Sequence, residues 1–180
     1  MNIFVIQVMT LGEEKFIALA KQALSREGYP AETGEQLLWP RRILEIRRAG
    51  RRFSRESALY PGYLFYRAED LDPDFYHLIR RIPGFIRFLK DNHHIEPLSR
   101  EDEELLRHFL SHGEVMGASR AYFDKDNRIR IVQGPLKGLE GRIIKVDKRK
   151  KRARVVLSLY KESYPIDLGF EIIQPAGEQG

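Results

Sequence analysis

One stretch of the sequence contains a break in regular structure followed by a predicted buried strand: Ser57-Ala-Leu-Tyr-Pro-Gly-Tyr-Leu-Phe-Tyr-Arg67. Pro61-Gly62 breaks the chain, because proline has no amide donor and glycine adopts backbone angles that other residues avoid. The next four residues, 63–66, are all aromatic or aliphatic, which is typical of a strand inside a sheet. The stretch therefore predicts an aromatic-rich strand that is entered through a tight turn.

Upstream of this stretch, the sequence predicts a strand, a helix and a hairpin. Residues 3–8 form an apolar run rich in β-branched residues, and Thr10-Leu-Gly-Glu13 after it has the pattern of a capping box. Apolar positions at helical spacing then continue until Gly28 and Pro30 end the helix. Residues 43–46 and 53–56 read as strands joined by Arg48-Ala-Gly-Arg51, whose glycine suits a hairpin tip.

Downstream, Asp72 before Pro73 predicts the start of a short helix, which residues 82–84 end. Residues 85–89 read as a strand, and Ser99 opens a third helix that closes near Gly113. The order β-α-β-β-β-α-β-α predicts an α+β sandwich with one antiparallel sheet over residues 1–112.

The remainder predicts a small second domain. Residues 113–125 mix small and charged residues without a period, which favours a linker. Residues 126–174 contain short alternating runs, best seen at 152–159, and predict an SH3-like β-barrel. We expect residues 175–180 to be a disordered tail.

Composition narrows the classes of protein. The chain has 180 residues, 42% of them hydrophobic, and a formal charge of +5, which permits a polyanionic partner. It has no cysteine, which excludes disulfides, thiol catalysis and cysteine-ligated metals. No apolar run reaches a membrane span or a signal peptide, so we expect a monomeric cytoplasmic protein.

Two groups of motifs resemble one family. Val132-Gln-Gly-Pro-Leu-Lys-Gly-Leu-Glu-Gly-Arg-Ile-Ile-Lys-Val-Asp147 resembles the KOW motif of elongation factors and ribosomal proteins. The strand at 3–8, the block 57–67 and the block 82–89 resemble, in order, the N-terminal (NGN) domain of NusG-type transcription factors. The arginine content and the ending Ile166-Asp-Leu-Gly-Phe-Glu-Ile-Ile173 are most similar to the specialised LoaP antiterminator group.

This resemblance implies two protein-binding sites. In the family, an aromatic pocket of the NGN domain binds the clamp helices of the largest RNA polymerase subunit, and the matching positions here are Phe4, Tyr60, Tyr63 and Phe65. Strand aromatics are also common in cores, and we expect Tyr63 and Phe65 to split between the two faces of the sheet. In the family the KOW barrel recruits a ribosomal protein or termination factor, and Tyr160 falls where the family places a docking aromatic. We expect Leu159, Tyr160 and Tyr164 to form this contact, although Tyr164, like Lys161 and Glu162, departs from the common family residue.

Charge indicates a nucleic-acid site. Between residues 41 and 55 there are seven arginines against the single acid Glu45. Arginine pairs phosphate in a fork and stacks on bases, so this composition favours a nucleic-acid face over a solvated hairpin. A second basic run at 142–154 is equally consistent with a solvated turn. The arginines of the first run are Arg41, Arg42, Arg47, Arg48, Arg51, Arg52 and Arg55.

The short helix after Pro73 carries a second candidate group. Tyr76, His77, Arg80 and Arg81 lie within one or two turns of each other, and stacking combined with guanidinium groups suits extruded bases. A solvated helix face explains the same pattern.

Catalytic and metal sites find little support. His108 and His112 are four residues apart on the third helix and could flank a zinc ion, but no third ligand is assured. The glycines at 134–141 lack the nucleotide-binding spacings. We expect no enzyme activity, no metal and no cofactor.

The leading hypothesis is a processive antitermination factor. It binds the polymerase clamp through the NGN domain, and an RNA hairpin or displaced DNA strand through the arginine-rich surface. The alternative is a housekeeping factor of the same family that bridges polymerase to the ribosome or to a termination factor through the barrel. A ribosomal RNA-binding protein is a third possibility, although it leaves residues 1–112 unexplained.

Overall fold

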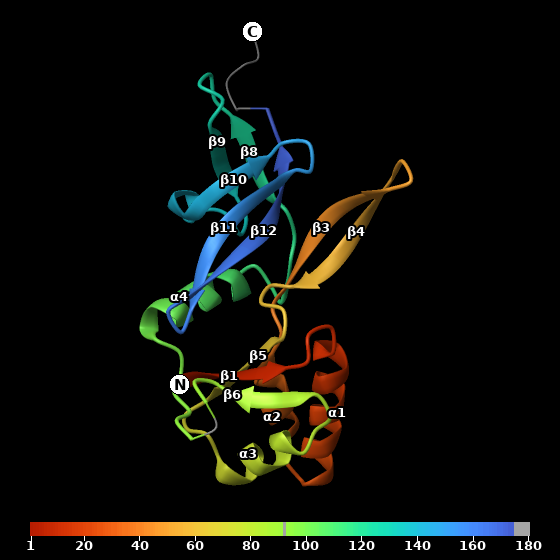
Figure 1. Cartoon of the computed structure of the whole chain (residues 1–180), viewed down its shortest axis with the longest axis vertical. Helices are drawn as coiled ribbons and strands as arrows, with labels where there is room; N and C mark the ends of the chain where they lie inside the picture. The colour runs from red at the N-terminus through yellow and green to blue at the C-terminus, as the bar shows by residue number, and fades with distance from the viewer. Residues whose placement is uncertain (92, 175–180) are drawn as a thin grey trace. The chain divides into compact units, whose positions relative to one another are not determined.

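The computed structural model describes residues 1–91 and 93–174, so the predicted disordered tail at 175–180 lies outside the described residues. The chain forms two compact units. The first contains Met1–Trp39 and Tyr60–Leu105, and the second contains Pro40–Leu59 and the chain from Leu106 onward. The first unit combines helices with a sheet and the second consists mainly of strands, which confirms the predicted α+β class (Figure 1).

The first unit is built on a four-stranded antiparallel sheet in the order β2-β5-β1-β6. The central strand β1 is buried on both faces, as its apolar sequence predicts. The strand predicted after the Pro61-Gly62 turn is confirmed and lies beside β1. The bounds are β1 Asn2–Val8, β2 Leu37–Leu38, β5 Tyr63–Ala68 and β6 Phe85–Phe88.

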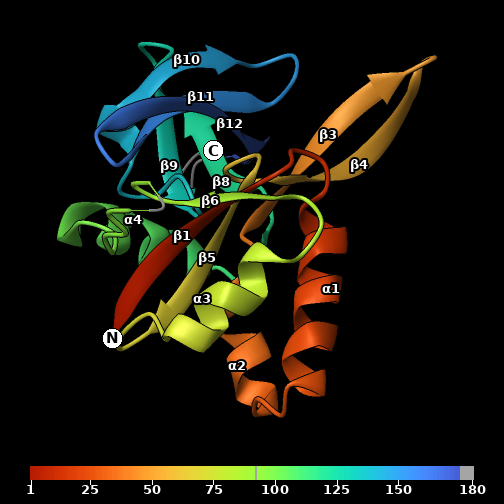
Figure 2. The same cartoon turned by 60° about the horizontal axis from the view of Figure 1, so that its bottom comes forward.

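Helices cover one face of this sheet. Phe16 of α1 and Phe75 of α3 are fully buried in one core with alternate residues of β1 and β5. Both views show α1, α2 and α3 on the same side of these strands (Figure 2). The bounds are α1 Glu13–Arg26, α2 Ala31–Glu35, α3 Pro73–Arg80 and α4 Arg100–Leu110.

The helix starts confirm two of three predicted caps. The Asp72 carboxylate accepts from the Asp74 and Phe75 amides, and Ser99 Oγ accepts from the Asp102 amide. The capping box at Thr10 is wrong, because α1 begins after Gly12 without a side-chain cap. The Glu13 carboxylate is buried and accepts instead from the Gly62 amide at 2.7 Å, so it anchors the Pro61-Gly62 turn.

The second unit contains a curled five-stranded sheet in the order β10-β11-β12-β8-β9, as expected for an SH3-like barrel. The predicted alternation is confirmed, because the odd-numbered residues 153–159 of β11 are buried. The predicted linker at 113–125 is not irregular: β8 lies within it and pairs in parallel with β12. The bounds are β8 Ser119–Phe123, β9 Ile129–Gln133, η1 Glu140–Arg142, β10 Ile143–Asp147, β11 Arg152–Leu159 and β12 Glu162–Ile172.

The predicted hairpin forms a separate sheet with one short strand. β3 (Arg41–Arg48) pairs along its length with β4 (Arg51–Ala58), and β7 (Val115–Met116) pairs in parallel with the start of β3. The prediction of one antiparallel sheet over residues 1–112 is therefore wrong. Most of β4 is exposed, and a strand this rich in arginine cannot be buried without counter-charges. We call β3 and β4 the arginine hairpin.

One glycine of the KOW-like stretch is required by space as well as by backbone angle. Gly134 has φ +100°, and a Cβ there would lie 2.7 Å from the Ser119 Cα. Ser119 is itself buried, and its Oγ accepts from the Leu136 amide at 2.9 Å. Gly138 also has a positive φ, +84°, but no atom lies within 4 Å of a Cβ built there.

We therefore expect Gly134→Ala to destabilise the second unit more than Gly138→Ala. Both changes carry a backbone cost of about 1–2 kcal/mol. Only the first also pushes Ser119 away, which we expect to add about 1–3 kcal/mol. Urea unfolding of the two variants, followed by circular dichroism, measures the difference. Equal losses would contradict the close approach at Ser119.

Candidate nucleic-acid interface

The arginine hairpin places like charges opposite each other at its tip. A two-residue turn, Ala49 and Gly50 with φ 50° and 75°, joins the strands. The register sets Arg48 opposite Arg51 and Arg47 opposite Arg52. Like charges directly opposite in a sheet are destabilising, so the folded hairpin alone does not account for this arrangement.

The alternation of side chains sorts the hairpin into two unequal faces. Residues opposite each other share a face, and the face alternates along each strand. One face has no acid, and we call it the acid-free face. The acid-free face comprises Arg42, Leu44, Ile46, Arg48, Arg51, Phe53, Arg55 and Ser57.

The opposite face carries both carboxylates of the hairpin. Arg41 Nη1 lies 2.8 Å from Glu56 Oε2, and Arg52 Nε lies 3.5 Å from Glu45 Oε1. Glu56 lies one residue beyond the run counted in the sequence. These two arginines are consequently partly neutralised within the hairpin.

Arg42 has a structural role. Its guanidinium donates to the carbonyls of Ala58 and Leu59 at the base of the hairpin. Burial lowers the pKa of Arg42 to about 10, while the nearby Asp167 carboxylate opposes this effect. Arg42 is therefore removed from the candidate contact residues, although its sequence position suggested it.

Four arginines remain available to a ligand. Arg47, Arg48, Arg51 and Arg55 are exposed. Within residues 1–91 and 93–174 their side chains have no hydrogen-bond or ion-pair partner. Three of the four lie on the acid-free face. An approaching polyanion would relieve their mutual repulsion and meet no carboxylate of the hairpin itself on that face.

Phe53 is a candidate that the sequence reasoning missed. It lies on the acid-free face between Arg51 and Arg55, and 48% of its surface is exposed. An exposed ring beside guanidinium groups suits an unpaired base, because stacking and phosphate pairing act together. The sequence did carry a signal for Phe53: in a strand, residues two apart share a face, and Arg51 and Arg55 each lie two residues from it.

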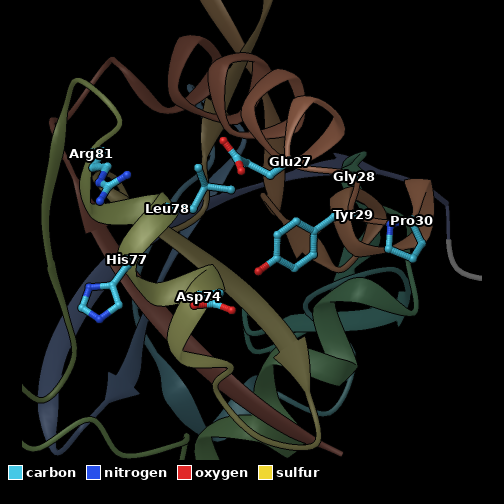
Figure 3. A pocket seen from close by; sticks show the side chains of 8 residues that line it. All are labelled: Glu27, Gly28, Tyr29, Pro30, Asp74, His77, Leu78 and Arg81. Atoms are coloured by element: carbon cyan, nitrogen blue, oxygen red, sulfur yellow. The ribbon is translucent and has the colours of Figure 1, made fainter.

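The predicted group on α3 divides. Tyr76 packs against Phe88 with ring centroids 5.3 Å apart, and the Arg80 guanidinium lies 5.1 Å from the Tyr76 ring. His77 and Arg81 instead line a pocket of about 540 Å³ with Tyr29 and Asp74 (Figure 3). The Tyr76 and His77 rings still meet edge to face, with centroids 5.4 Å apart, so the four residues form two adjoining groups.

Tyr29 and two acids give this pocket a mixed character. The Tyr29 hydroxyl donates to Asp72 Oδ2 at 2.9 Å. Burial and this hydrogen bond raise the pKa of Tyr29 to about 12, so the phenol stays protonated. Asp74 and Glu27 also line the pocket, which weakens it as a phosphate site.

The aromatic residues of the sheet are less exposed than the resemblance implied. Phe4 belongs to the helix-covered core, and its cross-strand neighbour is Tyr66. Tyr63 and Phe65 lie on the other face together, since residues two apart share a face, so the expected split between faces is wrong. Tyr60 and Phe65 are buried edge to face, with centroids 5.7 Å apart, and Tyr63 is half-buried. An exposed cluster of all four residues is therefore not present.

The barrel residues also differ in exposure. Leu159 is buried with the alternate apolar residues of β11. Tyr160 begins the two-residue turn to β12 with φ 50° and is half-buried, and the Tyr164 hydroxyl donates to Glu162 at 2.8 Å. Tyr160 and Tyr164 are both half-buried, and Tyr160 differs in lying in the turn itself.

The paired histidines serve structure. A ring nitrogen of His108 lies 2.8 Å from the Pro135 carbonyl, and burial, with the charge of His108, lowers the pKa of His112. In the part of the chain that the structure describes, no three His, Asp or Glu residues are arranged to hold a metal. The helices described there are all too short or too polar to cross a membrane.

Two family models match the chain. The NusG model, described as transcription termination factor nusG, matches residues 1–107, and the KOW motif matches residues 125–158. The fold and the first match together define a transcription regulator with an NGN domain and a KOW domain. The chain belongs to the NusG family of transcription termination and antitermination factors.

Individual relatives are distant but cover nearly the whole chain. The transcription termination/antitermination protein NusG of Helicobacter pylori strain 26695 is 24% identical over 160 residues, which cover 87% of this chain and 89% of the relative. The protein of the same name from Thermus thermophilus is 22% identical over 173 residues, covering 91% and 92%. A solved structure, "Domain interaction in Thermotoga maritima NusG", has a TM-score of 0.57 at 19% identity and covers 93% of both chains. This likeness supports the fold.

The like-charge pair at the hairpin tip makes a prediction about stability. We expect Arg51→Glu to raise the melting temperature by about 1 °C at low salt, because the new carboxylate would lie directly across the hairpin from the Arg48 guanidinium and replace a repulsive pair with an attractive one. Arg55→Glu makes the same change of charge opposite Leu44 and should give no such rise. Calorimetry of both variants tests this, and a lower melting temperature for Arg51→Glu would contradict repulsion at the tip.

Proposed function

We propose that this NusG-family chain is a processive antitermination factor that associates with RNA polymerase and captures a structured leader RNA on the acid-free face. The observation that carries the RNA proposal is the arginine hairpin, which has four exposed arginines without a counter-charge and, at its tip, two cross-strand pairs that are both arginine. Membership of the family supports the link to transcription.

The contacts available suit a folded RNA with unpaired bases. Arg48, Arg51 and Arg55 can each pair with phosphate, and Phe53 between them can stack on a base. Loops and bulges present both features side by side. A displaced DNA strand offers the same chemistry and is the second candidate ligand.

Polymerase association is proposed for the sheet face that carries Tyr60, Tyr63 and Phe65. Tyr63 is the accessible member of this group, whereas Phe4 lies in the core beneath the helices. We therefore assign the direct contact to Tyr63 and a supporting role to the Tyr60 and Phe65 pair. The largest-subunit clamp helices remain the proposed partner.

The alternative is a housekeeping factor that bridges polymerase to a ribosomal protein or termination factor through Tyr160. Its position at the β11–β12 turn favours a contact there. Association of the full chain with those partners, compared with Tyr160→Ala, separates the two proposals. A specialised antiterminator should bind them weakly in both forms.

The RNA proposal is tested with the full chain and a fluorescein-labelled RNA stem–loop. We expect Arg48→Gln with Arg51→Gln to weaken binding at least tenfold and to lower the slope of log affinity against log salt by about 1.5–2. Phe53→Leu should weaken binding to a stem–loop with an unpaired loop more than to a blunt duplex, because only the loop offers bases to stack.

The matched control is Arg52→Gln with Arg41→Gln. It removes the same charge from the same hairpin, but on the face where Glu45 and Glu56 already pair these arginines. We expect a loss of threefold or less. Equal losses for the two double variants would refute a face-specific site, and absence of binding by the unmodified chain at low salt would refute the RNA proposal itself.

A transcription assay tests the two functions separately. We expect Arg48→Gln with Arg51→Gln to remain bound to elongating polymerase in pull-down experiments while losing leader-dependent readthrough of a terminator. Tyr63→Ala should reduce the pull-down itself. If the arginine variant also lost polymerase, the hairpin would belong to the polymerase contact and the assignment of roles would be wrong.

A further inference from the structure

The turn between β10 and β11 carries a second group of unpaired cations. Residues 148–151 connect the two strands, and Arg149 and Lys150 within them are exposed. Among the described residues their side chains have no ion-pair or hydrogen-bond partner. The turn is ordered through its backbone, because the Lys150 amide donates to Asp147 Oδ1 at 2.8 Å. We call residues 148–151 the barrel turn.

The barrel is joined to the arginine hairpin beside this turn. Arg152 Nη2 donates to the Glu45 carbonyl of β3 at 2.8 Å. Farther along β3, Gly169 of β12 lies so close to the strand that a Cβ there would be 3.3 Å from the Ile43 carbonyl oxygen. These two contacts fall on the edge of β3 beyond its pairing with β7. Hairpin and barrel belong to the same compact unit.

A groove lies where the two meet. It has a volume of about 410 Å³ and is lined by Glu45, Ile46, Arg47, Arg149, Lys150 and Arg152. In both overall views the loop joining β10 and β11 lies on the hairpin side of the barrel (Figures 1 and 2). Four of the six lining residues are cations that come from two segments about a hundred residues apart in the chain.

The single carboxylate in the groove is already engaged. The Glu45 carboxylate forms an ion pair across the hairpin, with Oε1 3.5 Å from Arg52 Nε. The backbone carbonyl of Glu45 separately accepts a hydrogen bond from Arg152. Arg47, Arg149 and Lys150 are therefore left with an uncompensated positive charge. A string of phosphates is the ligand that satisfies several such cations spaced along one groove.

We propose that the hairpin and the barrel turn form one composite groove for a phosphodiester backbone, so that the KOW domain supplies half of the nucleic-acid site. This inference rests on the proposed nucleic-acid role of the hairpin and extends it to Arg149 and Lys150. The phosphate backbone would run past Arg47, which lies on the opposite face of the hairpin from Phe53, and meet the barrel turn. Arg152 acts as a positioning residue, because it holds the Glu45 backbone against the barrel.

The test is the affinity of the full chain for a fluorescein-labelled RNA stem–loop with a single-stranded extension. We expect Arg149→Gln with Lys150→Gln to weaken binding roughly tenfold at 0.1 M salt and to lower the salt slope by about 1.4–1.8, since each phosphate contact contributes about 0.7–0.9. The same measurement with DNA of the same sequence shows whether the groove accepts both backbones.

The control is Lys125→Gln with Arg128→Gln on the β8–β9 turn. It removes one lysine and one arginine from another exposed turn of the same unit. We expect less than a threefold loss. Equal losses in the two double variants would show general electrostatic attraction and overturn the groove.

The outcomes separate this inference from the proposed function. If the Arg48 and Arg51 variant loses binding while the Arg149 and Lys150 variant does not, the hairpin binds RNA and the composite groove is wrong. If the unmodified chain does not bind RNA or DNA, the proposed function itself fails.

The absence of cysteine allows a direct measurement of the groove. Cysteines introduced by Ile46→Cys and Arg149→Cys should be joined by a short bismaleimide in the free protein. Bound RNA should protect the pair from the reagent, whereas it should leave a pair made by Lys125→Cys and Arg128→Cys reactive. Failure of the first pair to cross-link would show that hairpin and barrel turn do not face each other, and would overturn the inference.

Discussion

The register of the arginine hairpin is the constraint on which the candidate site depends. The two-residue turn at Ala49 and Gly50 sets Arg48 opposite Arg51, and the alternation of side chains then assigns every other residue to a face. A slip of one residue in one strand would move that strand's side chains to the other face. The acids would then no longer gather on one side, and the uncompensated face would disappear.

The same hairpin explains why the two compact units do not follow the sequence order. The prediction of a domain at 1–112 treats residues 41–58 as part of the first sheet, whereas these residues pack with the C-terminal unit. An arginine-rich strand cannot enter a core, but its edge can be covered by polar contacts. Arg152 covers the edge of β3 by donating a hydrogen bond to the Glu45 carbonyl. Gly169 has no side chain, so β12 can also approach this edge closely at Ile43.

Local signals in the sequence predict most elements, whereas long-range pairing decides the site. Three predictions rest on signals only a few residues long, and the structure confirms all three. They are the helix start at Asp72 and Pro73, the turn at Ala49-Gly50 and the alternation in β11. The pairing of β8 with β12 joins segments about fifty residues apart, and a five-residue strand has too little pattern to reveal it. The burial of Tyr60 likewise depends on tertiary packing, including its contact with Phe65, which the neighbouring residues in the sequence do not predict.

The chemistry of the groove and the acid-free face also limits how this chain can recognise its ligand. Guanidinium groups on phosphates fix position without reading sequence, and a ring such as Phe53 stacks on any base. No rigid helix is offered to a DNA major groove by these surfaces, which consist of strands and turns. Under the proposed function, selectivity among transcripts would come from the shape of the RNA: a stem that places its phosphates along the hairpin and the barrel turn, and an unpaired base at Phe53. A family member with these surfaces would discriminate a folded leader from a linear transcript by geometry, since only a fold presents all three contacts at once.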